Sequence, residues 1–226
     1  MEILPLIVLK NNNESESEEE EFDESILETL GLDNDGDSNS YNNIINIIDK
    51  FKNRRIYLFG DICTYNILVV VNQIHILESR DPNSDIELYI NSGGGFVIDC
   101  LALIDTMDAS RCDFKVTVLG MAASAACLIA SNGTPGKRYA GRNSEFMFHE
   151  VSGPVSEMKL SELEYYGKEA KRVQEKFNRI FTRNTGLSSL IMKKEFYRPK
   201  DKFLTAVEAR KFGIVDHVLT PRRKKK

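Results

Sequence analysis

The sequence predicts an α/β fold built on a mostly parallel sheet, and two patterns carry this prediction. Short apolar stretches rich in β-branched and aromatic residues alternate with longer stretches of helical periodicity. Regular alternation of this kind is typical of parallel strands joined by helical crossovers. A chain of 226 residues with 42% hydrophobic residues is also long enough to bury a sizeable core.

The expected elements follow one another along most of the chain. Helices are expected at residues 41–52, 65–79, 96–108, 124–131, 157–183 and 188–195, and strands at 56–59, 86–90, 115–119 and 214–218, with extended pieces at 137–140 and 145–149. Thr205-Ala-Val-Glu208 is a capping box that opens a last helix, and Gly213 ends it.

Both ends of the chain differ in composition from this body. Residues 1–10 form a short apolar strand or loop, and residues 11–38 hold twelve acidic side chains and no Lys or Arg, so we expect an acidic disordered insertion there. Residues 39–220 form the expected folded domain. The tail at 221–226 is basic, and because no aromatic stacking platform accompanies it, we favour a frayed tail over a nucleic-acid contact.

Several classes of protein are not expected. No apolar run is long enough to cross a membrane, and residues 1–9 lack the basic start and cleavage site of a signal peptide, so a cytoplasmic protein is expected. The four cysteines lie far apart, which favours reduced, mostly buried thiols over disulfides or a zinc site. Asp33, Asp35 and Asp37 hint at a calcium loop, but its twelfth position is Ile44, so no metal is expected.

Ser124 lies where the apolar strand at 115–119 passes into a helix of small apolar residues. A serine at this junction can present its hydroxyl beside unpaired helical N–H groups, which favour a developing oxyanion. It can equally be an ordinary N-cap, whose oxygen only satisfies the first helical turn. The residue taken alone favours the cap, so the decision depends on its partners.

Candidate partners are few. Of the three histidines, His75 falls in a helical apolar pattern and His217 in the last strand, whereas His149 ends an extended run, where active-site groups of parallel sheets gather. Asp201 stands between two lysines, and a solvated aspartate is its default interpretation. The loop Asn91-Ser-Gly-Gly-Gly95 allows close backbone approach to a ligand, without the spacing of a nucleotide site.

Taken together, these features resemble the ClpP family of self-compartmentalising serine proteases. The resemblance runs from about Ser40 to Thr220. Its motifs are Tyr89-Ile-Asn-Ser-Gly-Gly-Gly95, Ile104-Asp-Thr-Met107, Gly120-Met-Ala-Ala-Ser124, Gly136-Lys-Arg-Tyr139, Asn143-Ser144, Phe148-His149, Asp201-Lys-Phe-Leu204, Glu208-Ala209 and Gly213-Ile-Val-Asp216.

The resemblance implies a function and a fold. It makes Ser124 the nucleophile, His149 the general base, Asp201 the group that orients His149, and the N–H groups of Gly95 and Ala125 the oxyanion hole. It implies a ClpP/crotonase-like spiral of repeated β-β-α units, with residues 157–183 as a protruding handle helix. It further implies two stacked seven-membered rings that enclose the sites, unfolded polypeptides as substrates, and no metal or cofactor.

The sequence also departs from the family. The glycine loop lacks the family's usual proline, and Ala125 replaces a usual methionine beside the specificity pocket. The resemblance places the docking surface for an AAA+ unfoldase at Glu87, Tyr89, Ala109, Tyr139 and Leu219, where Glu87 and Ala109 replace aromatic residues. A charge in an apolar socket is costly when it is desolvated unpaired.

Other functions therefore remain open. One is a ClpP-like protease that works without an ATPase, such as a viral capsid-maturation protease. Another is a non-catalytic structural subunit of the ring, against which the intact Ser124, His149 and Asp201 argue. The third is an acyl-CoA hydratase or isomerase of the same fold, which would not need this set of residues. For residues 11–38, an electrostatic gate at the pore entrance and a functionless solvated insertion stay equally open.

Overall fold

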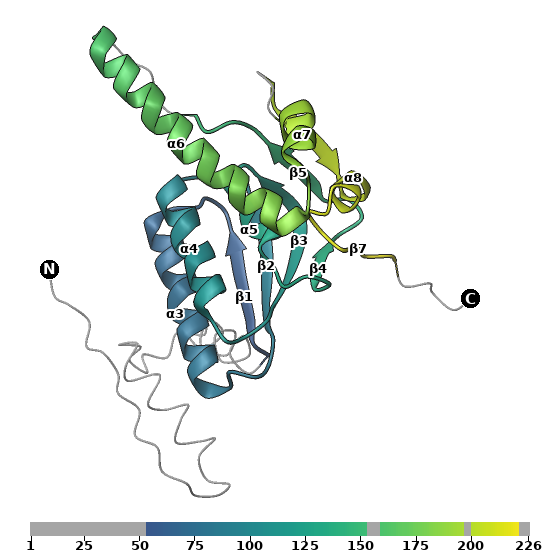
Figure 1. Cartoon of the computed structure of the whole chain (residues 1–226). Helices are drawn as coiled ribbons and strands as arrows, with labels where there is room; N and C mark the ends of the chain where they lie inside the picture. The colour runs from purple at the N-terminus through teal and green to yellow at the C-terminus, as the bar shows by residue number, and fades with distance from the viewer. Residues whose placement is uncertain (1–52, 153–158, 197–199, 222–226) are drawn as a thin grey trace, which may run out of the picture. The chain divides into compact units, whose positions relative to one another are not determined.

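The computed structural model describes residues 53–152, 159–196 and 200–221. The chain divides into two units, Met1–Asn53 and Arg54–Lys226, and almost all described residues belong to the second (Figure 1). The expected helix at 41–52, the acidic segment 11–38, residues 1–10 and the basic side chains at 222–226 lie outside the described residues.

The second unit alternates strands and helices as expected, and its α/β class is confirmed. The strands are β1 (Arg55–Phe59), β2 (Ile86–Ser92), β3 (Phe114–Ala123), β4 (Arg138–Ala140), β5 (Glu145–Phe148), β6 (Lys202–Thr205) and β7 (His217–Val218). The helices are α3 (Thr64–Arg80), α4 (Val97–Ala109), α5 (Ala125–Ser131), α6 (Leu160–Thr185), α7 (Ser189–Ile191) and α8 (Ala206–Lys211), with a π-helical turn η1 (Met192–Phe196) after α7.

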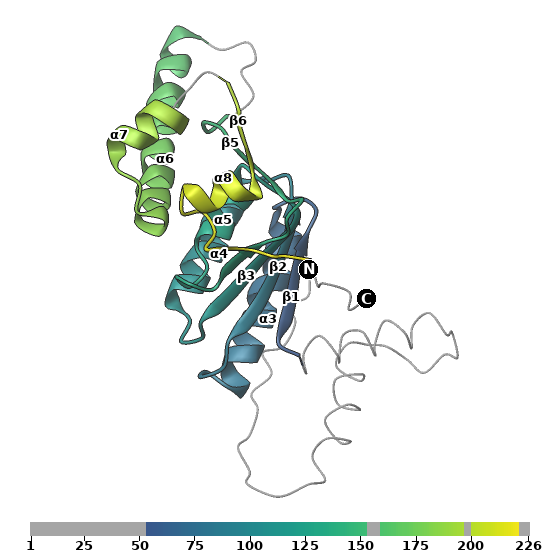
Figure 2. The same cartoon turned by 90° about the vertical axis from the view of Figure 1, so that its right-hand side faces the viewer.

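One seven-stranded sheet organises the unit. Its main path is β1-β2-β3-β4-β7, and β5 leaves this path by pairing with the last residues of β3. All pairs are parallel except β5 with β6. Helices α3 and α4 cover one face of the sheet (Figures 1 and 2). The strands bury alternate residues against these helices, for example Ile56 and Leu58 of β1.

Three strands differ from the sequence prediction, and one of them, β7, is shorter than the expected 214–218. Strand β3 continues to Ala123 instead of ending at residue 119, because Gly120 adopts a positive φ of 88° and the strand resumes beyond it. There the N–H of Met121 donates to Asn91 Oδ1. Strand β6 lies in a stretch for which no strand was predicted, and it forms by antiparallel pairing with β5, a contact between distant parts of the sequence.

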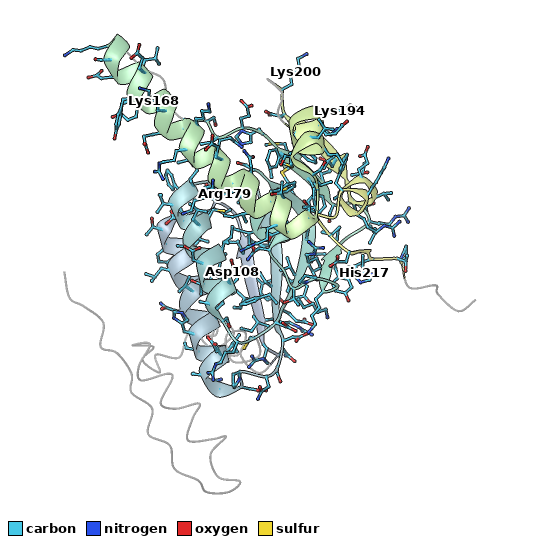
Figure 3. The ribbon with its side chains drawn as sticks, viewed as in Figure 1. Asp108, Lys168, Arg179, Lys194, Lys200 and His217 are labelled. Atoms are coloured by element: carbon cyan, nitrogen blue, oxygen red, sulfur yellow. The ribbon has the colours of Figure 1, made fainter. Side chains whose placement is uncertain are left out.

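The long helix α6 has two different halves. The residues of its first half are almost all exposed, and this half extends away from the sheet (Figure 1). The second half buries Phe177 and Phe181 against the body. Near its end Arg183 pairs with Asp108 of α4, labelled in Figure 3, at 2.8 Å, and the helix ends at Gly186, which has a φ of 72°.

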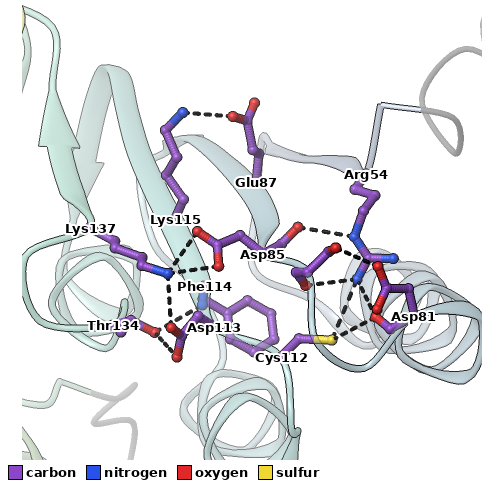
Figure 4. A network of polar contacts seen from close by, with 11 residues as sticks. Arg54, Asp81, Asp85, Glu87, Cys112, Asp113, Phe114, Lys115, Thr134 and Lys137 are labelled. Carbon is purple, nitrogen blue, oxygen red and sulfur yellow. Dashed lines mark hydrogen bonds and ion pairs between the residues drawn. The ribbon is translucent and has the colours of Figure 1, made fainter.

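Charged side chains tie together the N-terminal ends of the parallel strands (Figure 4). The Arg54 guanidinium, just before β1, donates to the backbone carbonyls of Leu77, Asp81, Ser84 and Asp85 at 2.9–3.0 Å. Lys137, just before β4, pairs with Asp85 at 2.7 Å and with Asp113, just before β3, at 2.8 Å. This N-terminal network therefore fixes how the strands begin.

Candidate active site

At the opposite ends of the strands, the glycine loop after β2 is held by its neighbours. The buried Ser92 hydroxyl accepts the Gly94 N–H at 3.1 Å. Ile62 bonds the loop twice, because its N–H donates to the Gly94 carbonyl and its carbonyl accepts the Phe96 N–H, both at 2.8 Å. In such a parallel bridge the N–H of the intervening residue, Gly95, points away from Ile62.

Only glycine fits at two positions of this loop. A Cβ on Gly95 would lie 2.1 Å from the Ile62 carbonyl oxygen, and one on Gly94 would lie 2.8 Å from the Cβ of Ser124. Both residues also have positive φ angles, 100° at Gly94 and 153° at Gly95. The glycine loop therefore packs directly against the backbone that carries Ser124.

Ser124 occupies the N-cap position of α5 in an unusual conformation. Its φ of 54° lies in the left-handed region, which costs a residue with a side chain of this kind about 1–3 kcal/mol. Its hydroxyl accepts no hydrogen bond from the helix, so the simple capping role is wrong. The Ser124 N–H instead donates to the Met147 carbonyl of β5 at 2.8 Å. All residues of α5 are buried, so this helix forms a fixed base under the hydroxyl.

His149 is the residue that meets the Ser124 hydroxyl. Its Nε2 lies 2.8 Å from Ser124 Oγ. The parallel pairing of Ala123 with Met147 explains this contact, since it brings the residues just beyond both strands together. The other two histidines lie elsewhere. His75 is exposed on α3, and His217 in β7 stacks on Tyr139 with a ring separation of 4.8 Å.

Two backbone N–H groups face the same space as the hydroxyl. Gly95 and Ala125, the first residue of α5, line one pocket together with Ser124 and His149. Among the described residues, neither N–H has a hydrogen-bond acceptor. The arrangement is a candidate oxyanion hole, because unpaired donors beside a nucleophile stabilise negative charge that develops there.

The pocket has a volume of about 250 Å³ and mostly apolar walls. Besides Ser124, His149, Gly95 and Ala125, the residues that line the pocket are not among the predicted site residues. Its other lining residues are Gly93, Val97, Phe148, Glu150, Val151, Ser152 and Phe177. Phe177 belongs to an apolar stripe on α6 with Phe181, and this i, i+4 spacing was the available signal for a buried face.

Asp201 lies next to His149 in the sheet but does not bond to it. The antiparallel register pairs Phe148 with Lys202, so the preceding Asp201 lies alongside His149. The Asp201 side chain is exposed, and among the described residues no hydrogen bond joins it to His149. The structure therefore brings together Ser124, His149 and the N–H groups of Gly95 and Ala125. Asp201 lies beside His149 without a hydrogen bond to it in the described part of the chain.

The cysteines near the site are not suited to act as nucleophiles. All four are free, and Cys100, Cys112 and Cys127 are buried, as expected. Burial raises the pKa of Cys127 to about 12 and raises that of Cys100, whose thiol donates to the Ala125 carbonyl at 3.4 Å. Buried neutral thiols of this kind are unreactive.

The described residues offer neither a metal-binding cluster nor a membrane-spanning helix. No cluster of three His, Cys, Asp or Glu side chains is placed to hold a metal ion in this part of the chain. Across the same residues, none of the helices has the combination of length and apolar character that crossing a bilayer requires.

The predicted docking residues lie mostly on the uncovered face of the sheet. The Glu87 carboxylate accepts hydrogen bonds from Lys115 at 2.6 Å, Tyr89 at 2.9 Å and Arg55 at 3.3 Å. Burial raises its pKa, but these hydrogen bonds outweigh that effect and hold the pKa below its usual value. The charge of Glu87, which would be costly in a docking surface if it were unpaired, is therefore paired within the chain.

The other docking candidates divide between two places. Tyr89 stacks on Tyr57 with a ring separation of 5.2 Å. Tyr139 of β4 is half-buried, and Leu219, just beyond β7, is exposed. Ala109 ends α4, in the helical layer of the unit. A single chain therefore does not assemble all five residues into one surface.

An α/β fold with a serine–histidine contact beside two unpaired N–H groups defines a candidate acyl-transfer enzyme. Comparison with known proteins identifies its relatives. A model of the Clp protease family matches residues 38–222, so the chain belongs to the Clp protease family.

Individual relatives agree with this assignment. The chain is 37% identical over 188 residues to the ATP-dependent Clp protease proteolytic subunit 2 of Mycobacterium leprae, a match that covers 83% of this chain and 84% of the relative. It is 35% identical over 187 residues to the ATP-dependent Clp protease proteolytic subunit 1 of Rhodococcus jostii, with 83% and 81% covered. The resemblance noted in the sequence is thereby confirmed.

Proposed function

We propose that this chain is a serine endopeptidase that cleaves unfolded polypeptides inside a chamber formed by copies of itself. The observation that carries the proposal is the 2.8 Å contact between Ser124 Oγ and His149 Nε2, beside the N–H groups of Gly95 and Ala125. Membership of the Clp protease family supports the same activity.

In the first half of the proposed reaction, Ser124 Oγ attacks the carbonyl carbon of the scissile peptide bond. His149 Nε2 takes the hydroxyl proton as the bond forms. The carbonyl oxygen becomes an oxyanion, which the N–H groups of Gly95 and Ala125 stabilise. The tetrahedral species collapses, His149 returns the proton to the departing amine, and the acyl group stays on Ser124.

In the second half, water takes the place of the amine. His149 removes a proton from the water, which attacks the acyl carbon, and then returns the proton to Ser124 as the carboxylic product leaves. Asp201 is proposed to orient the His149 ring from its position just before β6. His149 directly follows β5 and Asp201 directly precedes β6, so the two residues lie opposite each other at the end of this antiparallel pair.

Assembly and partners are part of the same proposal. Two stacked seven-membered rings would bury the apolar side chains that α6 exposes, Leu163, Tyr165 and Tyr166. The relatives are named as subunits of ATP-dependent proteases, which supports an AAA+ unfoldase as partner. Such a partner must dock on a surface whose charges at Glu87, Lys115 and Arg55 are already paired. Four free thiols suit the reducing cytoplasm.

The proposal is tested by digestion of casein by the assembled particle, with Ser124→Ala as the matched inactive variant. Loss of a nucleophile of this kind lowers kcat by roughly 10⁵- to 10⁶-fold. Wild-type particles should degrade casein, and the variant should assemble equally well without degrading it. Equal digestion by both proteins would reject the assignment of Ser124, and no digestion by an assembled wild-type particle would favour a structural subunit. Adding an unfoldase separates ATP-dependent from ATPase-independent proteolysis.

A further inference from the structure

One face of α6 contacts the segment that carries His149. This face consists of Gln174, Phe177, Asn178 and Phe181, which recur at i, i+3, i+4 and i+7. The Phe181 ring packs against Phe148 with a centroid separation of 4.9 Å, and Phe177 lines the pocket. Helix α6 therefore supports the residue before His149 by apolar packing.

A hydrogen bond from the same face supports the residues after His149. The N–H of Val151 donates to Gln174 Oε1 at 2.6 Å. The side-chain amide of Gln174 in turn donates to Asn178 Oδ1 at 3.0 Å, which fixes the direction of its oxygen. Both Gln174 and Val151 are half-buried, so water competes only weakly for this bond.

The backbone around His149 has few other restraints. Strand β5 ends at Phe148, and residues 149–152 belong to no helix or strand. Within the described part of the chain, the bond to Gln174 is the only hydrogen bond made by the backbone of residues 150–152. Among the described residues, no hydrogen bond joins Asp201 to His149. The position of the imidazole therefore depends on how its backbone is anchored on either side.

We propose that Gln174 is a positioning residue, whose side-chain oxygen holds the Val151 N–H and thereby keeps His149 Nε2 within reach of Ser124 Oγ. The role rests on the proposed peptidase function. Gln174 does not line the pocket, so it touches neither substrate nor reacting atoms. It acts through the three-residue link from Val151 back to His149, and small displacements at a catalytic base are enough to slow a reaction about 100-fold.

The test compares two substitutions of Gln174, of which only one keeps an oxygen that can accept the Val151 N–H. Gln174→Leu removes the acceptor at similar size, whereas Gln174→Glu keeps an oxygen that accepts the Val151 N–H. Lys171→Leu, on an exposed part of α6, is the control for added apolar surface. Each protein is assembled, its active sites are counted by reaction with a fluorophosphonate, and hydrolysis of a fluorogenic peptide is measured per active site.

Gln174→Leu should lower kcat roughly 10- to 100-fold with KM close to the wild-type value, because the base and not the binding pocket is displaced. Gln174→Glu should stay within about threefold of wild type, because its carboxylate oxygen still accepts the Val151 N–H. Hydrogen exchange of the peptide spanning residues 146–152 should be faster in Gln174→Leu than in Gln174→Glu.

The possible failures are distinguishable. If assembled wild type hydrolyses the peptide and Gln174→Leu matches it per site, the positioning role is wrong and the proposed function stands. The same conclusion follows if Gln174→Glu is as slow as Gln174→Leu, or if exchange is equal in the two variants. If assembled wild type neither hydrolyses the peptide nor reacts with the fluorophosphonate, the proposed function fails, and the role of Gln174 fails with it.

Discussion

The two ends of the parallel sheet are built in opposite ways. At the N-terminal ends of the strands, Arg54 and Lys137 donate to carbonyl and carboxylate oxygens of the surrounding loops. At the C-terminal ends, Gly95 and Ala125 hold N–H groups that have no acceptor among the described residues. The polar groups at the N-terminal ends are hydrogen-bonded within the chain, whereas the two N–H groups at the C-terminal ends can donate to a ligand.

This difference separates stability from function within one sheet. Satisfied hydrogen bonds add to the free energy of unfolding, whereas unpaired donors subtract from it. Ligands of open α/β sheets bind outside the carboxyl ends of the strands, and the polar groups of this chain follow that rule. Substitutions at the N-terminal ends should therefore change stability alone, and those at the C-terminal ends should chiefly change activity.

The largest effect is expected from Gly95→Ala. A methyl group there would lie 2.1 Å from the Ile62 carbonyl oxygen, and because this atom belongs to the backbone, the loop itself must shift. The N–H of residue 95 would then leave the oxyanion position, and peptide hydrolysis should fall by more than about 10³-fold, because displacement of the loop adds to the cost of one lost donor. Gly93→Ala is the matched control, since a methyl group there meets nothing within 4 Å. Similar losses in both variants would contradict this explanation.

Asp201→Asn should give the next largest effect, again on activity. If Asp201 orients His149 during the reaction, the amide should lower kcat by roughly 10³-fold, less than loss of the serine. The melting temperature should not change, because the side chain is exposed. Steady-state kinetics and thermal unfolding of the same sample provide both measurements. An unchanged kcat would remove Asp201 from the mechanism.

At the opposite end of the sheet, Arg54→Met should reduce stability and spare the chemistry. The substitution removes a donor from four part-buried carbonyl oxygens, of which those of Leu77 and Asp81 keep a second donor, and it should cost about 3 kcal/mol of unfolding free energy. Hydrolysis per active site should remain at the wild-type level. Arg54→Lys should recover only part of the loss, since an ammonium cannot reproduce the planar set of donors. A large loss of activity per site would show that the two ends are not independent.

The smallest effect is expected from Lys137→Met, and it should depend on pH. The hydrogen bond from Lys137 lowers the pKa of Asp113, and the same contact raises the pKa of Lys137. Because both partners are partly exposed, the pair should contribute about 1 kcal/mol or less.

The stability that the Lys137–Asp113 pair contributes depends on pH because the pKa of Asp113 is lowered and that of Lys137 is raised. A depressed aspartate pKa stabilises the fold above pH of about 4, and the contribution disappears as the pH falls through the folded-state value. A raised lysine pKa gives stability that is present below pH of about 10 and lost as the pH rises further. Urea unfolding of wild type and variant should therefore differ at pH 7 and converge as the pH falls below the lowered pKa of Asp113. A difference that persists in acid would point to packing rather than charge.

The sequence predicted the regular parts of the molecule well, for physical reasons. Strands such as β1 and β2 bury alternate residues, and helices such as α3 and α4 bury residues at helical spacing, so local patterns were sufficient. The Thr205–Glu208 capping box also formed as predicted, with both of its hydrogen bonds present. Family membership was recognised from spaced motifs and is confirmed.

Features set by contacts between distant residues were not predictable in this way. Strand β6 needs β5 as its partner, and the last strand is only His217–Val218 because Ile214 bonds back to Ala209 at the end of α8. The bond from Val151 to Gln174 spans 23 residues and has no sequence pattern. The ion pairs of Glu87 likewise come from different strands, so the sequence alone left its charge unpaired.

The central claim is that Ser124 is a nucleophile activated by His149, and labelling with a fluorophosphonate tests it most directly. The assembled wild-type protein should gain one adduct per chain, and peptide mapping should place it on Ser124. His149→Ala should react far more slowly, and Ser124→Ala should not react at all. An adduct on another residue, or equal labelling of wild type and Ser124→Ala, would contradict the account.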